Sequence, residues 1–155
     1  MPAMTKARGL AALVIAVILL GASCAESGDP VRATLDAMVK SANARDARAL
    51  FSRVSPTFQA ADGSGLADAR AIVERYFAAY EILNVSIRDI QVERGEGAAR
   101  VRLRAEMSGQ PRKIGGLEGL VPSSAAYDFD LRLTSEGGSW KVAWAQWNPA
   151  GSPAP

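Results

Sequence analysis

The chain has 155 residues, of which 48% are hydrophobic and 22% are charged, so it is long enough for one globular core and unlike a disordered or fibrous chain. Two of its 18 basic residues, Lys6 and Arg8, lie in an N-terminal segment without acids, and in the remainder basic and acidic residues are equal in number. A formally neutral chain without a basic run offers no strong field for a polyanion, so no nucleic-acid partner is expected.

The first 23 residues have the layout of a secretory signal peptide. Lys6 and Arg8 form a short basic start, an uninterrupted apolar run covers residues 10–20, and three small residues precede Cys24. The apolar run is shorter than the roughly 20 residues that span a bilayer. We therefore expect residues 1–23 to be removed after export and to form no part of the fold.

Cys24 is the only cysteine in the chain, which excludes an intrachain disulfide and a thiolate metal cluster. The stretch Leu-Leu-Gly-Ala-Ser-Cys at residues 19–24 resembles a bacterial lipobox, whose cysteine is acylated and becomes the mature N-terminus. Gly21 departs from that pattern, because a leucine or a similar residue is usual three places before the cysteine.

The lipobox resemblance implies a lipid-bearing tether at residues 24–28 and attachment to a membrane on the periplasmic side of a bacterial envelope. By resemblance to enterobacterial lipoproteins, Ala25 after the cysteine favours the outer membrane. Two other outcomes stay open. Ordinary signal peptidase cleavage after Ser23 or Ala25 would release a soluble periplasmic protein, and a segment that is not cleaved would act as an N-terminal anchor.

Three helices are predicted next. Asp29 and Pro30 signal a helix start, because Asp accepts free N–H groups of the first turn and Pro suits the first helical position. Asp46 caps a second, short helix that must end near Pro56, and residues 57–65 are expected to be loop. A third helix is expected from about residue 66 to residue 83, with one apolar side made of Ile72, Val73, Tyr76, Phe77, Tyr80 and Leu83.

After Asn84 the apolar period changes to two, which indicates strands. The phase of the first strand inverts near Arg88 and Asp89, and this inversion predicts a bulge there. Further strands are expected at residues 101–107, 127–133 and 140–147, followed by a disordered tail at 149–155. Their clean alternation predicts an antiparallel sheet with one covered face and one wet face.

Strand parity assigns side chains to the two faces. Asp128 and Asp130 have the parity opposite to the apolar residues between 127 and 133, so they are expected to face outward and to pair with Arg100, Arg102 or Arg104. In the last strand Trp147 has the parity expected for an exposed contact. The other parity of that strand comprises Trp140, Val142, Trp144 and Gln146.

Three helices followed by a curled antiparallel sheet, ending in a strand that reads Gly-Gly-Ser-Trp-Lys-Val-Ala-Trp-Ala-Gln-Trp, resemble the nuclear-transport-factor-2-like superfamily over residues 29–148. The resemblance implies an α+β cone, with N-terminal helices packed on the sheet and a pocket between them. Members of the superfamily serve as enzymes, binding modules or assembly domains, so the fold does not choose a function.

No catalytic residue is assigned, because the chain has no histidine and its candidate carboxylates, Asp128 and Asp130, are expected to face outward. Tyr76, Tyr80, Trp144 and Gln146 are candidates for lining a pocket, although packing in the core is the plainer account of such aromatics. Within the Gly- and Pro-rich segment 108–126, Ile114, Leu117 and Leu120 are candidates for a lid, or else complete the core.

The leading hypothesis is an envelope lipoprotein whose single domain binds a small apolar ligand or an envelope protein, without catalysis, cofactor or metal. One alternative is an isomerase, dehydratase or hydrolase of the same fold that uses a carboxylate. The other is a structural module that forms a homodimer through the charged face of its sheet.

Overall fold

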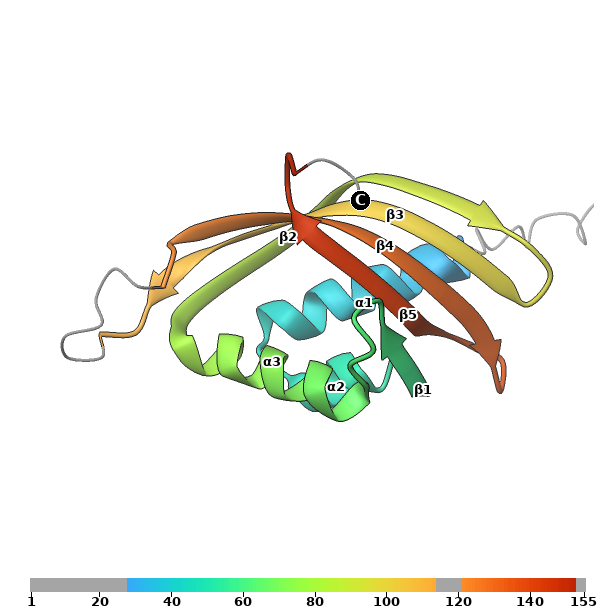
Figure 1. Ribbon diagram of the computed structural model, residues 1–155, viewed down its shortest axis with the longest axis horizontal. Helices are drawn as coiled ribbons and strands as arrows, with labels where there is room; N and C mark the ends of the chain where they lie inside the picture. The colour runs from blue at the N-terminus through green and yellow to red at the C-terminus, as the bar shows by residue number, and fades with distance from the viewer. Residues whose placement is uncertain (1–27, 114–120, 153–155) are drawn as a thin grey trace, which may run out of the picture.

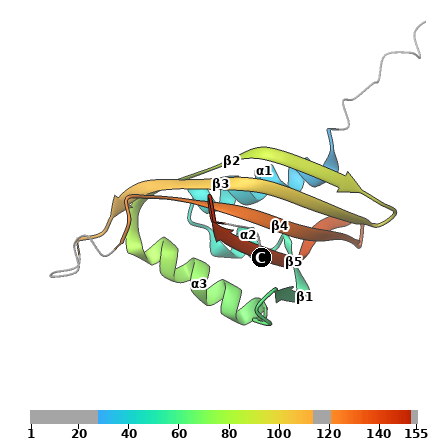
Figure 2. The same cartoon turned by 45° about the horizontal axis from the view of Figure 1, so that its top comes forward.

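The computed structural model of the protein describes residues 28–113 and 121–152, so the predicted signal peptide and Cys24 lie outside the described residues. The chain forms, in order, α1 (Pro30–Asn43), α2 (Ala47–Phe51), β1 (Val54–Ala60), α3 (Leu66–Ala79), β2 (Tyr80–Arg94), β3 (Ala98–Pro111), β4 (Ser124–Glu136) and β5 (Ser139–Pro149). The strands form one curled sheet in the order β1-β5-β4-β3-β2, and the helices lie on its concave face (Figure 1 and Figure 2). The predicted α+β class is confirmed. No helix in these two ranges has the length and apolarity needed to cross a membrane.

Both predicted helix caps are present. Asp29 accepts a hydrogen bond from the backbone N–H of Val31 at 2.9 Å, and Asp46 accepts one from Ala49 at the same distance. Val31 and Leu35 of α1 are buried against the middle of the sheet. The helix therefore begins where its N–H groups find a cap and is held in place by its apolar stripe.

Side chains from the end of α1 occupy part of the outer edge of β2. The side-chain amide of Asn43 makes the two bonds that a neighbouring strand would make. Its nitrogen donates to the carbonyl of Val85 at 3.0 Å, and its oxygen accepts from the Val85 N–H at 2.6 Å. Arg45 donates to the carbonyl of Tyr80 at 2.7 Å. These bonds satisfy backbone groups that no neighbouring strand reaches.

The expectation of a loop over residues 57–65 is wrong for its first part, because β1 extends to Ala60. This strand pairs with β5 in parallel, so the sheet is mixed and not wholly antiparallel. Pro56 concealed the strand from the sequence pattern. A proline lacks the N–H that a central strand needs, but β1 lies at the edge of the sheet and its register shifts between Val54 and Gln59, where a proline is tolerated.

The third helix is shorter than predicted and ends at Ala79. Tyr80 has extended dihedrals, φ −112° and ψ 137°, and β2 begins there without a loop. Residues 80–83 fit both a helical and a strand pattern, and pairing with β3 decides between them. A Cβ on Gly109 of β3 would overlap the carbonyl oxygen of Ile82 and stand 2.9 Å from the ring of Tyr80, so this junction requires glycine.

The predicted faces of β3 and β4 are confirmed. Val101, Leu103, Leu131 and Leu133 are buried on the concave side. The arginines and aspartates alternate with them on the convex side and pair across the two strands. The predicted bulge in β2 is also present, since the register shifts between Arg88 and Gln91. Asp89 there has a φ of 55°.

A second bulge, in β5, was not predicted and reverses the assignment of that strand. Leu133 pairs with Val142 but Arg132 pairs with Trp144, which leaves Ala143 as an extra residue. Trp144 and Gln146 therefore lie on the convex face. Trp147 is on the concave face, where its ring stacks on Phe129 with the centroids 6.2 Å apart. The expected placements of these three residues are wrong because a bulge changes which side each following residue faces.

The described chain stays folded beyond the expected boundary at residue 148. Pro149 ends β5, and the N–H of Ala150 donates to the carbonyl of Ala126 at 2.8 Å. The N–H of Ser152 then donates to Pro149 at 3.1 Å. The turn of residues 149–152 therefore belongs to the domain, and the remainder of the predicted tail lies outside the described residues.

The two faces of β4 predict opposite responses to substitution. Leu131→Asp places an unpaired carboxylate in the core and should lower the free energy of unfolding by about 4 kcal/mol or prevent folding. Asp130→Asn should cost about 0–1 kcal/mol, because it removes an ion pair at the surface. Arg100 lowers the pKa of Asp130, so the small difference from wild type should be present above the usual pKa of an aspartate and vanish as the pH falls through the lowered value.

Urea unfolding of the two variants and the wild type at several pH values measures these effects. If Asp130→Asn unfolds the domain and Leu131→Asp is tolerated, the inner and outer faces of the sheet have been interchanged.

Candidate functional site

Helix α3 crosses the concave side of the sheet from one edge to the other. Its N-terminal end adjoins β1, where Gln59 forms a bridge with Gly65, and its C-terminal end continues directly into β2 at the opposite edge. At about 1.5 Å per residue its 14 residues span about 21 Å, close to the width of five strands spaced about 4.8 Å apart. The sheet is curled, so the helix spans its concave side and does not follow its curve.

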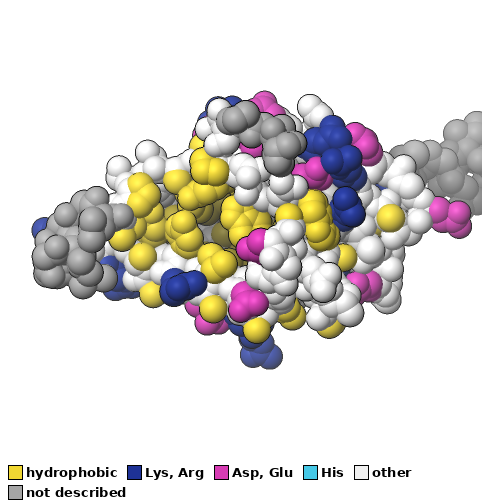
Figure 3. Space-filling model, in the orientation of Figure 1, with side chains coloured by type: hydrophobic (Ala, Val, Ile, Leu, Met, Phe, Trp, Pro, Cys, Tyr) yellow, Lys and Arg dark blue, Asp and Glu magenta, His cyan; other side chains and the backbone are white. Residues whose placement is uncertain are grey.

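The apolar side of α3 is only partly covered, and no residue of the helix is fully buried. Ile72, Val73 and Phe77 are half-buried, and Tyr76 is 36% exposed. Figure 3 shows hydrophobic side chains gathered around a hollow on this face of the molecule. The sequence pattern identified the side of α3 that faces inward, and the structure leaves that side only half-covered.

Small residues on the sheet help to keep the hollow open. Ala105 pairs with Tyr127, and Ala125 pairs with Met107, and all four have the parity that faces the concave side. Farther along the same face, larger side chains such as Leu133 close the core completely. The concave face therefore has a filled end under α1 and an open end opposite α3.

All three tyrosines of the chain meet at this open end. The hydroxyl oxygens of Tyr76 and Tyr127 are 3.3 Å apart, which joins α3 to β4. Tyr80 is 2% exposed and donates its hydroxyl to the carbonyl of Pro122 at 2.6 Å. We name these three residues the tyrosine cluster.

Tyr127 and Tyr80 of the tyrosine cluster are protonated at physiological pH. The hydrogen bond with Tyr76, followed by burial, raises the pKa of Tyr127 to about 12. Burial also raises the pKa of Tyr80. Within residues 28–113 and 121–152, no carboxylate hydrogen-bonds to any of the three hydroxyls. The cluster can therefore donate and accept hydrogen bonds, but it offers no base for removing a proton from a substrate.

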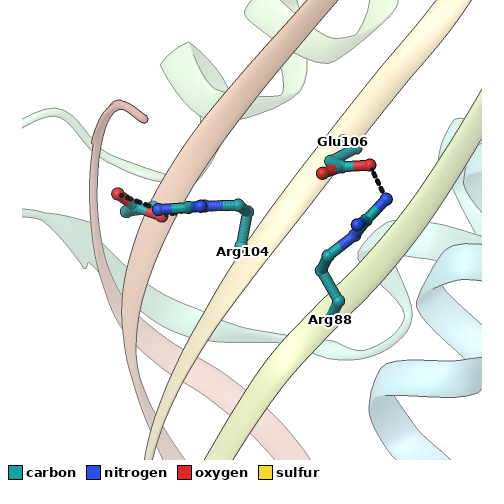
Figure 4. A network of polar contacts seen from close by, with 4 residues as sticks. Arg88, Arg104 and Glu106 are labelled. Atoms are coloured by element: carbon teal, nitrogen blue, oxygen red, sulfur yellow. Dashed lines mark hydrogen bonds and ion pairs between the residues drawn. The ribbon is translucent and has the colours of Figure 1, made fainter. Parts of the chain in front are cut away.

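The convex face carries a second candidate surface, made of paired charges. Arg100 binds Asp130 through two bonds of 3.0 and 2.5 Å, and Arg104 binds Asp128 through bonds of 2.8 and 3.2 Å. Arg88 pairs with Glu106 beside them (Figure 4). A shallow groove of about 540 Å³ runs over these pairs, lined by Asp89, Arg100, Arg102, Leu103, Arg104, Asp128, Phe129, Asp130, Gln146, Asn148 and Ser152.

The charges of the convex face are matched to one another. The guanidinium of Arg100 lowers the pKa of Asp130, and that of Arg104 lowers the pKa of Asp128. Carboxylates held in this way are weaker bases than free ones. The described part of the chain contains no group of three or more His, Cys, Asp or Glu residues that could hold a metal ion.

The structure brings together two of the four residues predicted to line a pocket, Tyr76 and Tyr80. Trp144 and Gln146 lie on the opposite face, where Arg132 covers the indole of Trp144 at 4.5 Å. Tyr127 completes the site. Its parity indicated that it faces the helices, but the sequence did not show which residue of the strand lies opposite α3. The lid candidates Ile114, Leu117 and Leu120 lie outside the described residues.

No family model and no curated protein matches the sequence. Solved structures do match. A candidate scytalone dehydratase from Novosphingobium aromaticivorans is 12% identical with a TM-score of 0.66, over 78% of this chain and 82% of that one. A candidate dehydratase of the nuclear-transport-factor-2-like family from Streptomyces avermitilis is 13% identical with a TM-score of 0.66, over 79% and 96%.

A nuclear-transport-factor-2-like protein of unknown function from Pseudomonas putida is similar at 13% identity and a TM-score of 0.60, over 76% of this chain and 82% of that one. Identities this low establish the fold alone. The helices on the concave face of a curled, five-stranded mixed sheet therefore give this chain the nuclear-transport-factor-2-like fold.

Proposed function

We propose that the domain binds a small apolar ligand in the hollow between α3 and the concave face, and that lipid on Cys24 holds it on the periplasmic side of a bacterial envelope. The observation that carries the binding proposal is the half-covered apolar side of α3, on the concave side that also carries Ala105 and Ala125. A concave apolar surface with a few polar groups is typical of small-molecule sites.

The tyrosine cluster restricts the chemistry of the ligand. Its hydroxyls bond to one another and to a backbone carbonyl, and the pKa values of Tyr127 and Tyr80 are raised, which keeps these two phenols protonated. Protonated phenols suit an uncharged oxygen acceptor such as a carbonyl or an ether. We therefore propose a ligand with an apolar body and a neutral oxygen at one end.

Binding without catalysis is the form of the proposal that the geometry supports. Two structural neighbours are candidate dehydratases, and this similarity favours the alternative that the chain is an enzyme. However, this chain has no histidine, and Asp128 and Asp130 are paired with arginines on the face opposite the tyrosine cluster. Removal of water from a substrate needs a group that can take a proton, and the described cluster does not supply one.

Adjacent alanines on β4 allow a matched test of the binding site. Ala125 faces the hollow and Ala126 faces the convex side. Nile red, a neutral apolar dye with a carbonyl, should bind to the wild type, and Ala125→Phe should weaken it at least about tenfold, or ~1.4 kcal/mol, by filling the space. Ala126→Phe should bind like the wild type.

Fluorescence titration of dye into each variant, with thermal unfolding as the check on folding, measures this effect. Equal loss of binding in both variants, or no binding to the wild type, would contradict a ligand site in the hollow.

The neutral state of the cluster predicts a specific alkaline titration. Tyr76→Phe removes the main cause of the raised pKa of Tyr127, so that pKa should fall from about 12 toward the ordinary value of 10.0. Because folding raises this pKa, protonated Tyr127 stabilises the fold below about pH 10, and the contribution is lost as the pH rises through about 12. Tyrosinate absorbance followed during the titration measures the shift, and Tyr127→Phe identifies the transition. If the absorbance transition with the highest pKa is still present in Tyr127→Phe, the raised pKa belongs to another tyrosine.

The anchor predicts a covalent change at Cys24. Mature protein isolated from the envelope should partition into detergent, with a mass that shows loss of residues 1–23 and gain of acyl groups. Cys24→Ala should block this processing and leave the precursor. An unmodified thiol at position 24 of the mature wild-type protein would refute lipid attachment.

A further inference from the structure

We propose that the domain stands on its membrane by the end that carries the β2–β3 and β4–β5 turns, with the hollow opening away from the lipid. The ligand is then exchanged with the aqueous compartment and not taken directly from the bilayer. This inference rests on the proposed anchor at Cys24, and it adds the source of the ligand to the proposed function.

The start of the described chain is fixed to one end of the sheet. Asp29, the cap of α1, forms an ion pair with Arg94, the last residue of β2. The hydroxyl of Thr34, one turn into the helix, is 3.5 Å from the carbonyl oxygen of Trp140 near the start of β5. The N-terminal end of α1 therefore lies beside the β2–β3 and β4–β5 turns, as Figure 1 and Figure 2 show.

The tyrosine cluster lies toward the other end. Tyr80 is the first residue of β2 and pairs with Pro111, the last residue of β3, whereas Arg94 ends β2 beside the turn. At about 3.3 Å per residue, β2 would measure about 45 Å if it were straight, which is an upper bound on the separation of Tyr80 and Arg94 because the strand is bulged and curled. The chain enters the domain at one end of this length, and the tyrosine cluster lies toward the other.

The predicted tether is short on this scale. Only residues 25–28 separate Cys24 from Asp29, and a fully extended chain of about 3.5 Å per residue gives a reach of about 17 Å. Asp29 must therefore stay within about 17 Å of the acylated cysteine at the lipid surface. The end of β2 that bears Tyr80 has no such restraint, so on average it is the farther end.

The surface at the tethered end suits lipid headgroups. Its two turns contain Gly95, Gly97, Gly137 and Gly138, which add no side-chain bulk, and the exposed Glu96, which suits neutral headgroups better than anionic ones. The indole of Trp140 is half-buried nearby, with the guanidinium of Arg94 at 5.7 Å from its ring. Tryptophan and arginine are residues that favour the interface between water and lipid. Ile82, which is 53% exposed, lies at the other end.

The orientation can be measured with single added cysteines, since Cys24 is the only cysteine and its sulfur carries lipid in the proposed mature form. Glu96→Cys marks the β2–β3 turn, and Gln110→Cys marks the far end of β3; both positions are exposed. The lipidated variants are reconstituted into phosphatidylcholine vesicles containing a headgroup-nitroxide lipid and are labelled from outside with a membrane-impermeant fluorescent maleimide. Quenching should be several-fold stronger at position 96 than at position 110. Equal quenching, or stronger quenching at position 110, would overturn the proposed orientation.

A variant with a longer tether tests whether the short tether causes the orientation. Twenty Gly/Ser residues inserted between Ser27 and Gly28 add an average reach of about 25 Å, which should reduce the difference between the two positions. A difference that is unchanged by the insertion would refute the tether argument. Failure of the anchor itself is recognised separately, because the wild-type chain would then not float with the vesicles, and the orientation proposal would fall with it.

Discussion

The direct continuation of α3 into β2 is the constraint on which the shape of the domain depends. The helix is held by β1 at one edge of the sheet and by its covalent link to β2 at the other, so it cannot settle onto the curved face between them. Its apolar side therefore stays half-covered, and the hydroxyls of Tyr76 and Tyr127 join the helix to β4. The core under α1 is free of this restraint and closes around fully buried side chains such as Leu133.

Local chemistry was enough to predict most of the fold. The caps at Asp29 and Asp46, the bulge near Asp89 and the faces of β3 and β4 each follow from a pattern contained within a few residues. The errors arose where pairing with a distant strand decided the outcome. Pro56 argued against β1, and the period was ambiguous at the start of β2.

The candidate site was less predictable than the fold for a related reason. A helical stripe that packs in a core and one that lines a hollow have the same period. The pattern in α3 therefore predicted which side of the helix faces the sheet, but not how completely that side is covered. The extra residue Ala143 in β5 has no local signal and moved Trp144 and Gln146 to the convex face. Tyr127 was placed on the correct face, but its neighbour Tyr76 is 51 residues away in sequence.

The amide of Asn43 bonds to both backbone groups of Val85, and this affects whether other chains can pair with β2. An exposed outer strand is a template on which another chain can add its own strand, and this is a common start of aggregation. Here the Asn43 side chain occupies the backbone groups of β2 that such an added strand would use. If copies of the chain are anchored side by side in a membrane, as proposed above, this side chain limits strand pairing between them.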